Sequence, residues 1–373
     1  MKRGHAAAFG IDALRKLPKE CELLVVGFLT VVDLCGGLAP TSSRFRDLVY
    51  ESKNWQKIRV TGLSNQRVLS IVGLHGRKMK SLSLYGMRVS RALCRIFSKC
   101  TRLQSLDLTG IWKSPAVDKR FVAAVSTLPL KRLLFGQNEL CDEGFDLICK
   151  SMPTLEELDF NSRRVSARSL YAVCMLRNLE SLCLRSCSKA NEDVVRSVCR
   201  LPALKTLQLS FLPMVHCSSL RHLYGQEYGI LERLETLVLN GMYIDKERLR
   251  ALSGMRKLRT LSLCHPKVNS RDLEGLCLPT LELLTVFCAN DLATFDFLGN
   301  LPSLRTLCLY RCACSNRSLM QWARKRPEMT VRIFASRPLR RAGERCADEP
   351  LDLAGHANIK ELQLMRRPYP MFF

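Results

Sequence analysis

Apolar residues recur in a fixed frame, leucine-x-x-leucine-x-leucine, from residue 79 onward. Ten consecutive copies follow one another at spacings of 23 to 30 residues. Their first positions are Met79, Leu103, Leu130, Leu155, Leu179, Leu204, Leu234, Leu258, Leu281 and Leu304. Leucine occupies every fourth position: Leu82, Leu106, Leu133, Leu158, Leu182, Leu207, Leu237, Leu261, Leu284 and Leu307. Apolar side chains at every second residue are typical of a strand with one buried face, so each copy predicts a short strand.

Each copy then changes to helical spacing. Val194, Val198 and Leu201 lie three or four residues apart, and the polar residues Asn191 and Glu192 precede them. Polar and acidic residues suit the first turn of a helix, where free amides and the positive dipole end lie. One strand and one helix cannot bury their apolar faces alone, so neighbouring units must stack. The sequence therefore predicts an α/β solenoid with parallel strands on its concave side and helices on its convex side.

At this repeat length, with a helix in each unit, the array resembles the ribonuclease-inhibitor-like class of leucine-rich repeats, which implies a right-handed horseshoe. Beyond the ten copies, residues 328–333 read as a strand of shifted register. A last run at Ile359, Leu362 and Leu364 reads as a capping unit. We therefore divide the chain into a flexible start (1–11), a small helical domain (12–60), the repeat array (61–335) and a basic tail (336–373).

The helical domain carries a second resemblance. Leu17-Pro18-Lys19-Glu20, then Phe28-Leu29, Asp33-Leu34, Ser42-Ser43-Arg44-Phe45 and Trp55 resemble the motif of an F-box. The resemblance implies a substrate receptor of an SCF-type cullin ubiquitin ligase, in which the F-box binds a Skp-type linker subunit and the repeats hold a substrate protein. It places the linker contact on Leu17, Pro18, Leu23, Leu29 and Leu34.

The segment departs from the F-box pattern in places. Cys21, Val26 and Thr41 replace more usual apolar residues, and the Gly36-Gly37 pair implies one extra residue in the second helix. The alternative interpretation is a helical cap that shields the first repeat, which any solenoid needs. In that case the chain is a structural scaffold of a larger assembly, for example a ribonucleoprotein, with no role in ubiquitin transfer.

The charge of the chain bears on its partners. Lys and Arg number 58 against 34 Asp and Glu, a formal net charge of +24, which favours acidic partners. The third, fifth and seventh positions of each copy, which should face the concave side, are nearly neutral. A phosphate backbone needs a basic track, so nucleic acid along the strands is disfavoured. Exposed aromatic residues are common anchors of protein interfaces. The predicted partner-binding residues are Tyr85, Asp107, Arg132, Glu157, Asp159, Arg185, Phe287 and Tyr310.

No glycine-rich phosphate loop, zinc-protease motif or nucleophile elbow occurs, so we expect no catalytic residue, metal or cofactor. His216 and His222 fall in the longest copy and read as solvent-facing.

The 18 cysteines are scattered, which favours a reducing compartment. Without an apolar run of bilayer length or a signal peptide, we expect a cytoplasmic or nuclear protein, a monomer within a complex. The basic first residues leave a mitochondrial presequence as the alternative.

Overall fold

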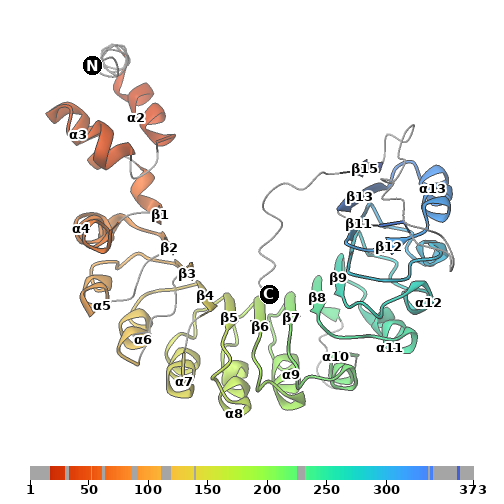
Figure 1. Ribbon diagram of the computed structural model, residues 1–373. Coiled ribbons are helices and arrows are strands. Elements are labelled where there is room, and N and C mark those ends of the chain that lie inside the picture. Colours follow the sequence, from red (N-terminus) through yellow and green to blue (C-terminus); the bar gives the residue numbers. More distant parts are fainter. Residues whose placement is uncertain are drawn as a thin grey trace. The chain divides into compact units, whose positions relative to one another are not determined.

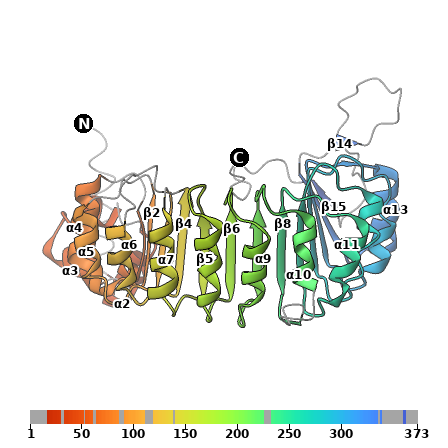
Figure 2. The same ribbon diagram turned by 90° about the horizontal axis from the view of Figure 1, so that it is seen from below.

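The computed structural model describes residues 17–29, 33–51, 53–60, 64–85, 91–110, 119–137, 140–224, 232–334, 337–338 and 359–361. The chain divides into two compact units, Met1–Asn138 and Glu139–Phe373. Within each unit, parallel strands lie side by side and the repeat helices cover one side of the sheet (Figures 1 and 2). We call the other side of each sheet the strand face.

In the first unit, the described residues from 17 onward form four short helices and then a parallel sheet. The leading helices are α2 (Lys19–Gly27), η1 (Asp33–Leu38), α3 (Ser43–Glu51) and η2 (Lys53–Gln56). The strands are β1 (Lys57–Val60), β2 (Ser81–Tyr85), β3 (Ser105–Gly110) and β4 (Arg132–Gln137). The helices between them are α4 (Asn65–His75), η3 (Gly76–Lys78), α5 (Arg91–Phe97) and α6 (Lys119–Ser126). Helix η1 is a π-helix, closed by a hydrogen bond of 2.9 Å from the Ala39 amide to the Leu34 carbonyl. A π-turn accommodates the extra residue expected around Gly36-Gly37.

The second unit repeats the strand-helix pattern. Its main strands are β5 (Glu157–Asn161), β6 (Ser181–Arg185), β7 (Thr206–Ser210), β8 (Thr236–Asn240), β9 (Thr260–Cys264), β10 (Leu283–Phe287), β11 (Thr306–Tyr310), β13 (Thr330–Phe334) and β15 (Ile359–Glu361). Its helices are α7 (Asp142–Ser151), α8 (Ala167–Tyr171), η4 (Ala172–Met175), α9 (Glu192–Cys199), η5 (Cys217–Leu220), α10 (Arg221–Tyr224), α11 (Lys246–Ala251), η8 (Leu252–Gly254), α12 (Ser270–Leu273), η9 (Asp296–Asn300) and α13 (Asn316–Lys325). The short strands β12 (Ala313–Cys314) and β14 (Arg337–Pro338) pair separately.

The ten fourth-position leucines are all fully buried, as the repeat frame predicts. The strand register places them side by side: Leu182 pairs with Leu207, and Leu237 with Leu261. First- and sixth-position residues are buried as well, with Phe135 and Phe160 filling two sixth positions. Burying each leucine contributes about 1.5–3 kcal/mol, so these rows form the core of each unit.

Hydrogen bonds close the turns of several repeats. The Asn191 side chain accepts from the Val194 amide at the start of α9, and Asn269 forms a capping box with Asp272 at the start of α12. Caps of this kind satisfy helix amides that have no partner within the helix. At the turn that follows the strand, several eighth-position residues adopt left-handed backbone angles, among them Phe211 (φ 54°) and Gly241 (φ 79°). The Phe211 amide donates to the Asn240 carbonyl at 2.9 Å, so this turn also joins neighbouring repeats.

Two sequence-based interpretations need correction. The predicted boundary at residue 60 is wrong as the start of the repeats, because β1 pairs in parallel with β2. Trp55, Ile58 and Val60 occupy the first, fourth and sixth positions of an additional copy and are buried. Nor is the register shifted in β13: Val331 pairs with Leu307 and Ile333 with Leu309. Only the first position differs, where the buried Met329 lies one residue later than the usual leucine. Strand β15 begins at the predicted capping run, whose Leu362 and Leu364 lie outside the described residues.

Candidate functional site

Asp107 is the acidic centre of the strand face in the first unit. Its carboxylate accepts hydrogen bonds from the Ser83 hydroxyl at 3.0 Å, the Thr109 amide at 3.0 Å and the Thr109 hydroxyl at 2.7 Å. Arg132 is exposed at the start of β4, where it pairs in register with Ser105 of β3. Tyr85 ends β2, and its side chain lies outside the described part of the structure. Asp107 is therefore a hydrogen-bonded polar site flanked by hydroxyls.

Asp159 and Arg185 form the equivalent polar site in the second unit. Arg185 of β6 is hydrogen-bonded and ion-paired to the Asp159 carboxylate of β5, and its Nε donates to the Cys183 sulfur at 3.1 Å. Only 9% of Asp159 is exposed. Burial, and after it the nearby Asp159 carboxylate, raise the pKa of the Cys183 thiol. The pair is thus mutually neutralised beside a protonated thiol, while Glu157 lies half-buried two residues before Asp159.

An aromatic row lies further along the same face. Phe287 of β10 stacks on Tyr310 of β11 with ring centroids 4.5 Å apart, and Tyr310 stacks on Phe334 of β13 at 4.2 Å. All three are partly exposed. The structure thus brings together two predicted residues and adds Phe334, which the sequence analysis missed. The signal was present, because Phe334 occupies the seventh position once β13 is read in the unshifted register.

The helical domain of the first unit carries an exposed apolar stripe along α2 and at its two ends. Leu17, Cys21, Leu24 and Phe28 recur at the spacing of one helix face, and all four are exposed, Leu24 by 68% and Phe28 by 89%. Pro18 is exposed, whereas Leu23 and Leu29 are half-buried. Leu34 is fully buried, so it packs inside the domain and offers no contact surface.

Contacts on the other side of α2 fix its orientation. Val26 is buried, and the buried Glu22 pairs with Arg44 of α3 at 2.8 Å. Lys19 pairs with Glu51 at the end of α3, also at 2.8 Å. These contacts orient α2 within the domain with its apolar stripe outward.

The domain is also tied to the first repeat. The indole of Trp55, at the first position of the additional copy, donates to the Val49 carbonyl of α3, and its ring stacks on the His75 ring of α4 with centroids 3.5 Å apart. Burial, and secondarily the charge of Lys78, lower the pKa of His75 to about 4. The neutral ring therefore belongs to the core at this junction.

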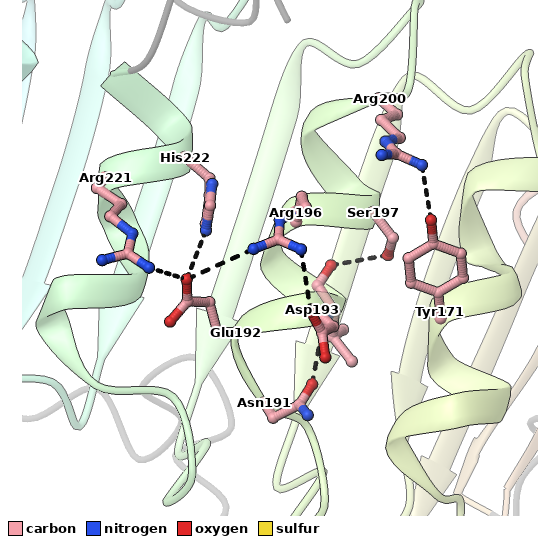
Figure 3. A network of polar contacts seen from close by, with 10 residues as sticks. Tyr171, Asn191, Glu192, Asp193, Arg196, Ser197, Arg200, Arg221 and His222 are labelled. Carbon is pink, nitrogen blue, oxygen red and sulfur yellow. Dashed lines mark hydrogen bonds and ion pairs between the residues drawn. The ribbon is translucent and has the colours of Figure 1, made fainter. Parts of the chain in front are cut away.

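On the helix side, a polar network joins α9 to α10, the helix of the longest repeat (Figure 3). The Glu192 carboxylate of α9 meets Arg221 and His222 of α10, with His222 Nε2 at 2.8 Å. Hydrogen bonds from His222 and Arg221 lower the pKa of Glu192. Only 13% of the His222 side chain is exposed, so the solvent-facing interpretation is wrong for this residue. His216, by contrast, is exposed. The network therefore links the helices of neighbouring repeats.

The described residues hold no group of three His, Cys, Asp or Glu side chains that a metal ion would need. Burial raises the pKa of Cys100 to about 11 and of Cys312 to about 12, so these thiols stay protonated at neutral pH. No helix in the described ranges is long and apolar enough to cross a membrane.

Comparisons with known proteins give one relative and several similar structures. No protein-family model matches the chain. Gastrulation-defective protein 3 of Caenorhabditis elegans is 28% identical over 152 residues, which cover 40% of this chain and 21% of that protein. The chain thus spans about a fifth of this relative's length.

Among solved structures, an internalin of Listeria monocytogenes gives a TM-score of 0.46 at 16% identity, covering 79% of this chain and 92% of the internalin. The TLR13–ssRNA13 complex gives 0.40 at 17%, covering 76% of this chain and 45% of the other. A leucine-rich-repeat protein of Leptospira interrogans gives 0.36 at 16%, covering 76% and 91%. The ten-copy frame and the parallel strands with buried leucines identify the fold of this chain as a leucine-rich-repeat solenoid.

Proposed function

We propose that the chain is a protein-binding scaffold that serves as the substrate receptor of an SCF-type cullin ubiquitin ligase. In this role the α2 stripe binds a Skp-type linker subunit, and the repeats hold the substrate. The observation that carries the proposal is the stripe of Leu17, Cys21, Leu24 and Phe28. A large aromatic ring exposed beside leucines is costly in water unless a partner covers it.

The stripe is also a surface of defined geometry. The ion pairs Glu22–Arg44 and Lys19–Glu51 and the buried Val26 hold α2 on its neighbours, so its outward face is set by packing. Apolar residues at helical spacing form the kind of face that a partner's helices cover. Together with the F-box-like motif, this face supports a linker contact.

Copurification tests the proposal. The tagged chain should retain a Skp-type linker and cullin from its own cell extract, and Leu24→Ser/Phe28→Ser should lose both while its circular dichroism spectrum is unchanged. Leu74→Ser is the matched control, because Leu74 is 71% exposed on α4, outside the stripe. Leu17→Ala/Pro18→Ala, at the start of the stripe, should also weaken retention. An unmutated chain that retains no linker refutes the ligase role.

A second function is favoured by one observation. Hydrogen bonds from Trp55 to the Val49 carbonyl of α3 and from Lys78 to the Tyr50 carbonyl, the latter at 2.6 Å, join the helical domain to the repeats as a cap would be joined. A capped structural scaffold would copurify with a protein assembly that contains neither linker nor cullin, and the α2 variant would leave that assembly intact.

A further inference from the structure

A charged groove lies at the amino edge of the second unit's sheet. Its volume is about 490 Å³, and its walls are the turns that lead into β8, β9, β10, β11 and β13. Basic and acidic side chains alternate from one turn to the next along this edge. The basic ones are Arg256, Lys257, Arg259, Arg305 and Arg326, and the acidic ones are Glu235, Glu282 and Glu328.

Two of the five cations are already engaged. Arg259 pairs with Glu282 at 2.9 Å, and Arg326 pairs with Glu328 at 3.1 Å. The Arg326 guanidinium also donates to four carbonyls of the preceding repeat, including Leu304 at 2.8 Å and Leu301 at 2.9 Å. It is therefore part of the groove wall.

Three cations remain for a ligand. Arg256, Lys257 and Arg305 are exposed and form no ion pair with any residue that the structure describes. The remaining carboxylate, Glu235, also acts on Lys205, whose pKa is raised mainly by Glu180 and to a smaller extent by Glu235. The groove therefore presents an excess of positive charge.

The strand spacing gives the distance between these charges. Arg256 and Lys257 precede β9, and Arg305 precedes β11, two strands away. Neighbouring strands are about 4.8 Å apart, so the segments that lead into β9 and β11 are roughly 10 Å apart across the sheet. An extended peptide covers this distance in about three residues.

We propose that this groove binds an acidic, extended segment of a partner protein, with carboxylates about three residues apart on Arg256–Lys257 and on Arg305. The inference rests on the proposed function of the repeats as a protein-binding surface and names the class of substrate. It does not depend on the helical domain, because every groove residue belongs to the second unit.

The acidic residues of the groove favour a peptide over a nucleic acid. Glu282 lies on the turn between the two positive positions, and Glu235 and Glu328 flank them. A nucleic acid carries a negative charge at every nucleotide and would set phosphates against these carboxylates. A peptide with neutral or basic residues between its acidic ones avoids this repulsion.

Fluorescence anisotropy with two labelled peptide pools tests the proposal on the full chain. Both pools are twelve residues long and random except at every third position, which is Asp or Glu in one and Asn or Gln in the other. The acidic pool should bind more tightly and lose affinity as salt rises. Lys257→Glu/Arg305→Glu should weaken this binding about tenfold or more, because both cations become repulsive.

The matched control is Lys267→Glu/Arg271→Glu, an equal change of charge at exposed residues outside the groove. It should leave the affinity within about twofold of the wild type. Equal loss in both double variants would show attraction to net charge alone and overturn the proposal, as would no preference for the acidic pool. Labelled oligouridine that binds through Lys257 and Arg305 in place of the peptides would replace it with a nucleic-acid site. Linker copurification is a separate measurement, so the ligase role and the groove can fail independently.

Discussion

At the scale of single residues, the repeat frame sets the cost of a truncated leucine. Leu207 is fully buried between Leu182 and Leu237 of the neighbouring strands. Leu207→Ala removes most of a buried side chain and leaves a cavity, so it should lower the free energy of unfolding by about 2–5 kcal/mol. Thr206→Ala, on the opposite face of β7, should cost well under half as much. Urea denaturation measures both, and similar losses would contradict the assigned strand face.

Alanine substitutions at two glycines should change the stability of the fold in opposite directions. A Cβ on Gly275 would lie 2.1 Å from the Lys246 carbonyl oxygen, so Gly275→Ala must push the start of α11 away. Overpacking of this kind costs about 1–3 kcal/mol. A Cβ on Gly73, inside α4, would meet no atom within 4 Å, so Gly73→Ala should stabilise by about 0.5–1 kcal/mol. Thermal unfolding of the two variants should shift in opposite directions, and a stabilised Gly275→Ala would refute the close approach.

His75 predicts how stability depends on pH. Its pKa is about 4 in the folded chain against an ordinary 6.5, because burial and Lys78 disfavour the imidazolium. Between these values the unfolded chain binds the proton and the folded chain does not. The stabilisation is therefore complete above pH 6.5 and is lost as the pH falls towards 4, by roughly 3 kcal/mol in all.

The matched variant for His75 is Phe, which preserves a ring against Trp55 and cannot be protonated. Denaturant unfolding at a series of pH values should give His75→Phe a shallower slope between pH 6.5 and 4 than the wild type. Identical slopes would mean that other groups govern acid unfolding in this range.

At the scale of elements, Arg326 joins one repeat to the next. From the end of α13 it donates to the carbonyls of Leu298, Leu301, Pro302 and Leu304, which end η9 and lead into β11. Arg326→Met removes these four hydrogen bonds, although the Leu298 and Leu301 carbonyls keep a backbone amide donor, and should cost about 2 kcal/mol. Arg324→Met, on the exposed side of the same helix, should cost under about 0.5 kcal/mol. Hydrogen exchange should show the loss around η9 and β11, and equal protection in both variants would argue against this role.

An element is predictable from the sequence when the burial pattern of its own copy determines its position. The strands follow from the frame because burial of the fourth and sixth positions leaves little choice of register. Strand β1 escaped notice because Trp55 stands where leucine is usual, and the same tryptophan fits the F-box-like motif. Phe334 was missed because Met329 displaces the first position of its copy, although the next positions keep their spacing.

The candidate sites were harder to predict, since they depend on neighbours from different repeats. Alternation along a strand places Asp159 and Arg185 on one face, but their pairing requires the register of β5 against β6. The burial of Leu34 depends on how the helices of the small domain pack, which the motif spacing does not state. The groove depends on charges at the ends of five separate strands, and no single copy shows it.

At the scale of the whole molecule, the chain holds an excess of positive charge. Its 58 Lys and Arg outnumber its 34 Asp and Glu, so an excess of 24 positive charges would remain even if every acidic side chain were paired as Glu282 is with Arg259. Folding brings like charges closer together, so their repulsion destabilises the compact state. Exposed cations such as Arg256, Lys257 and Arg305 add to that repulsion, and the proposed binding of an acidic segment would account for their presence.

This excess predicts a salt dependence of stability. Sodium chloride at about 0.15 M shortens the screening length to about 8 Å from about 30 Å at 0.01 M, which weakens long-range repulsion more than contacts within ion pairs. The melting temperature should therefore rise across this range. Arg256→Gln/Lys257→Gln should melt above the wild type at the lower salt concentration, and the difference should shrink at the higher one. Differential scanning calorimetry measures both effects, and a melting temperature that falls with salt would mean that attractive pairs outweigh the net charge.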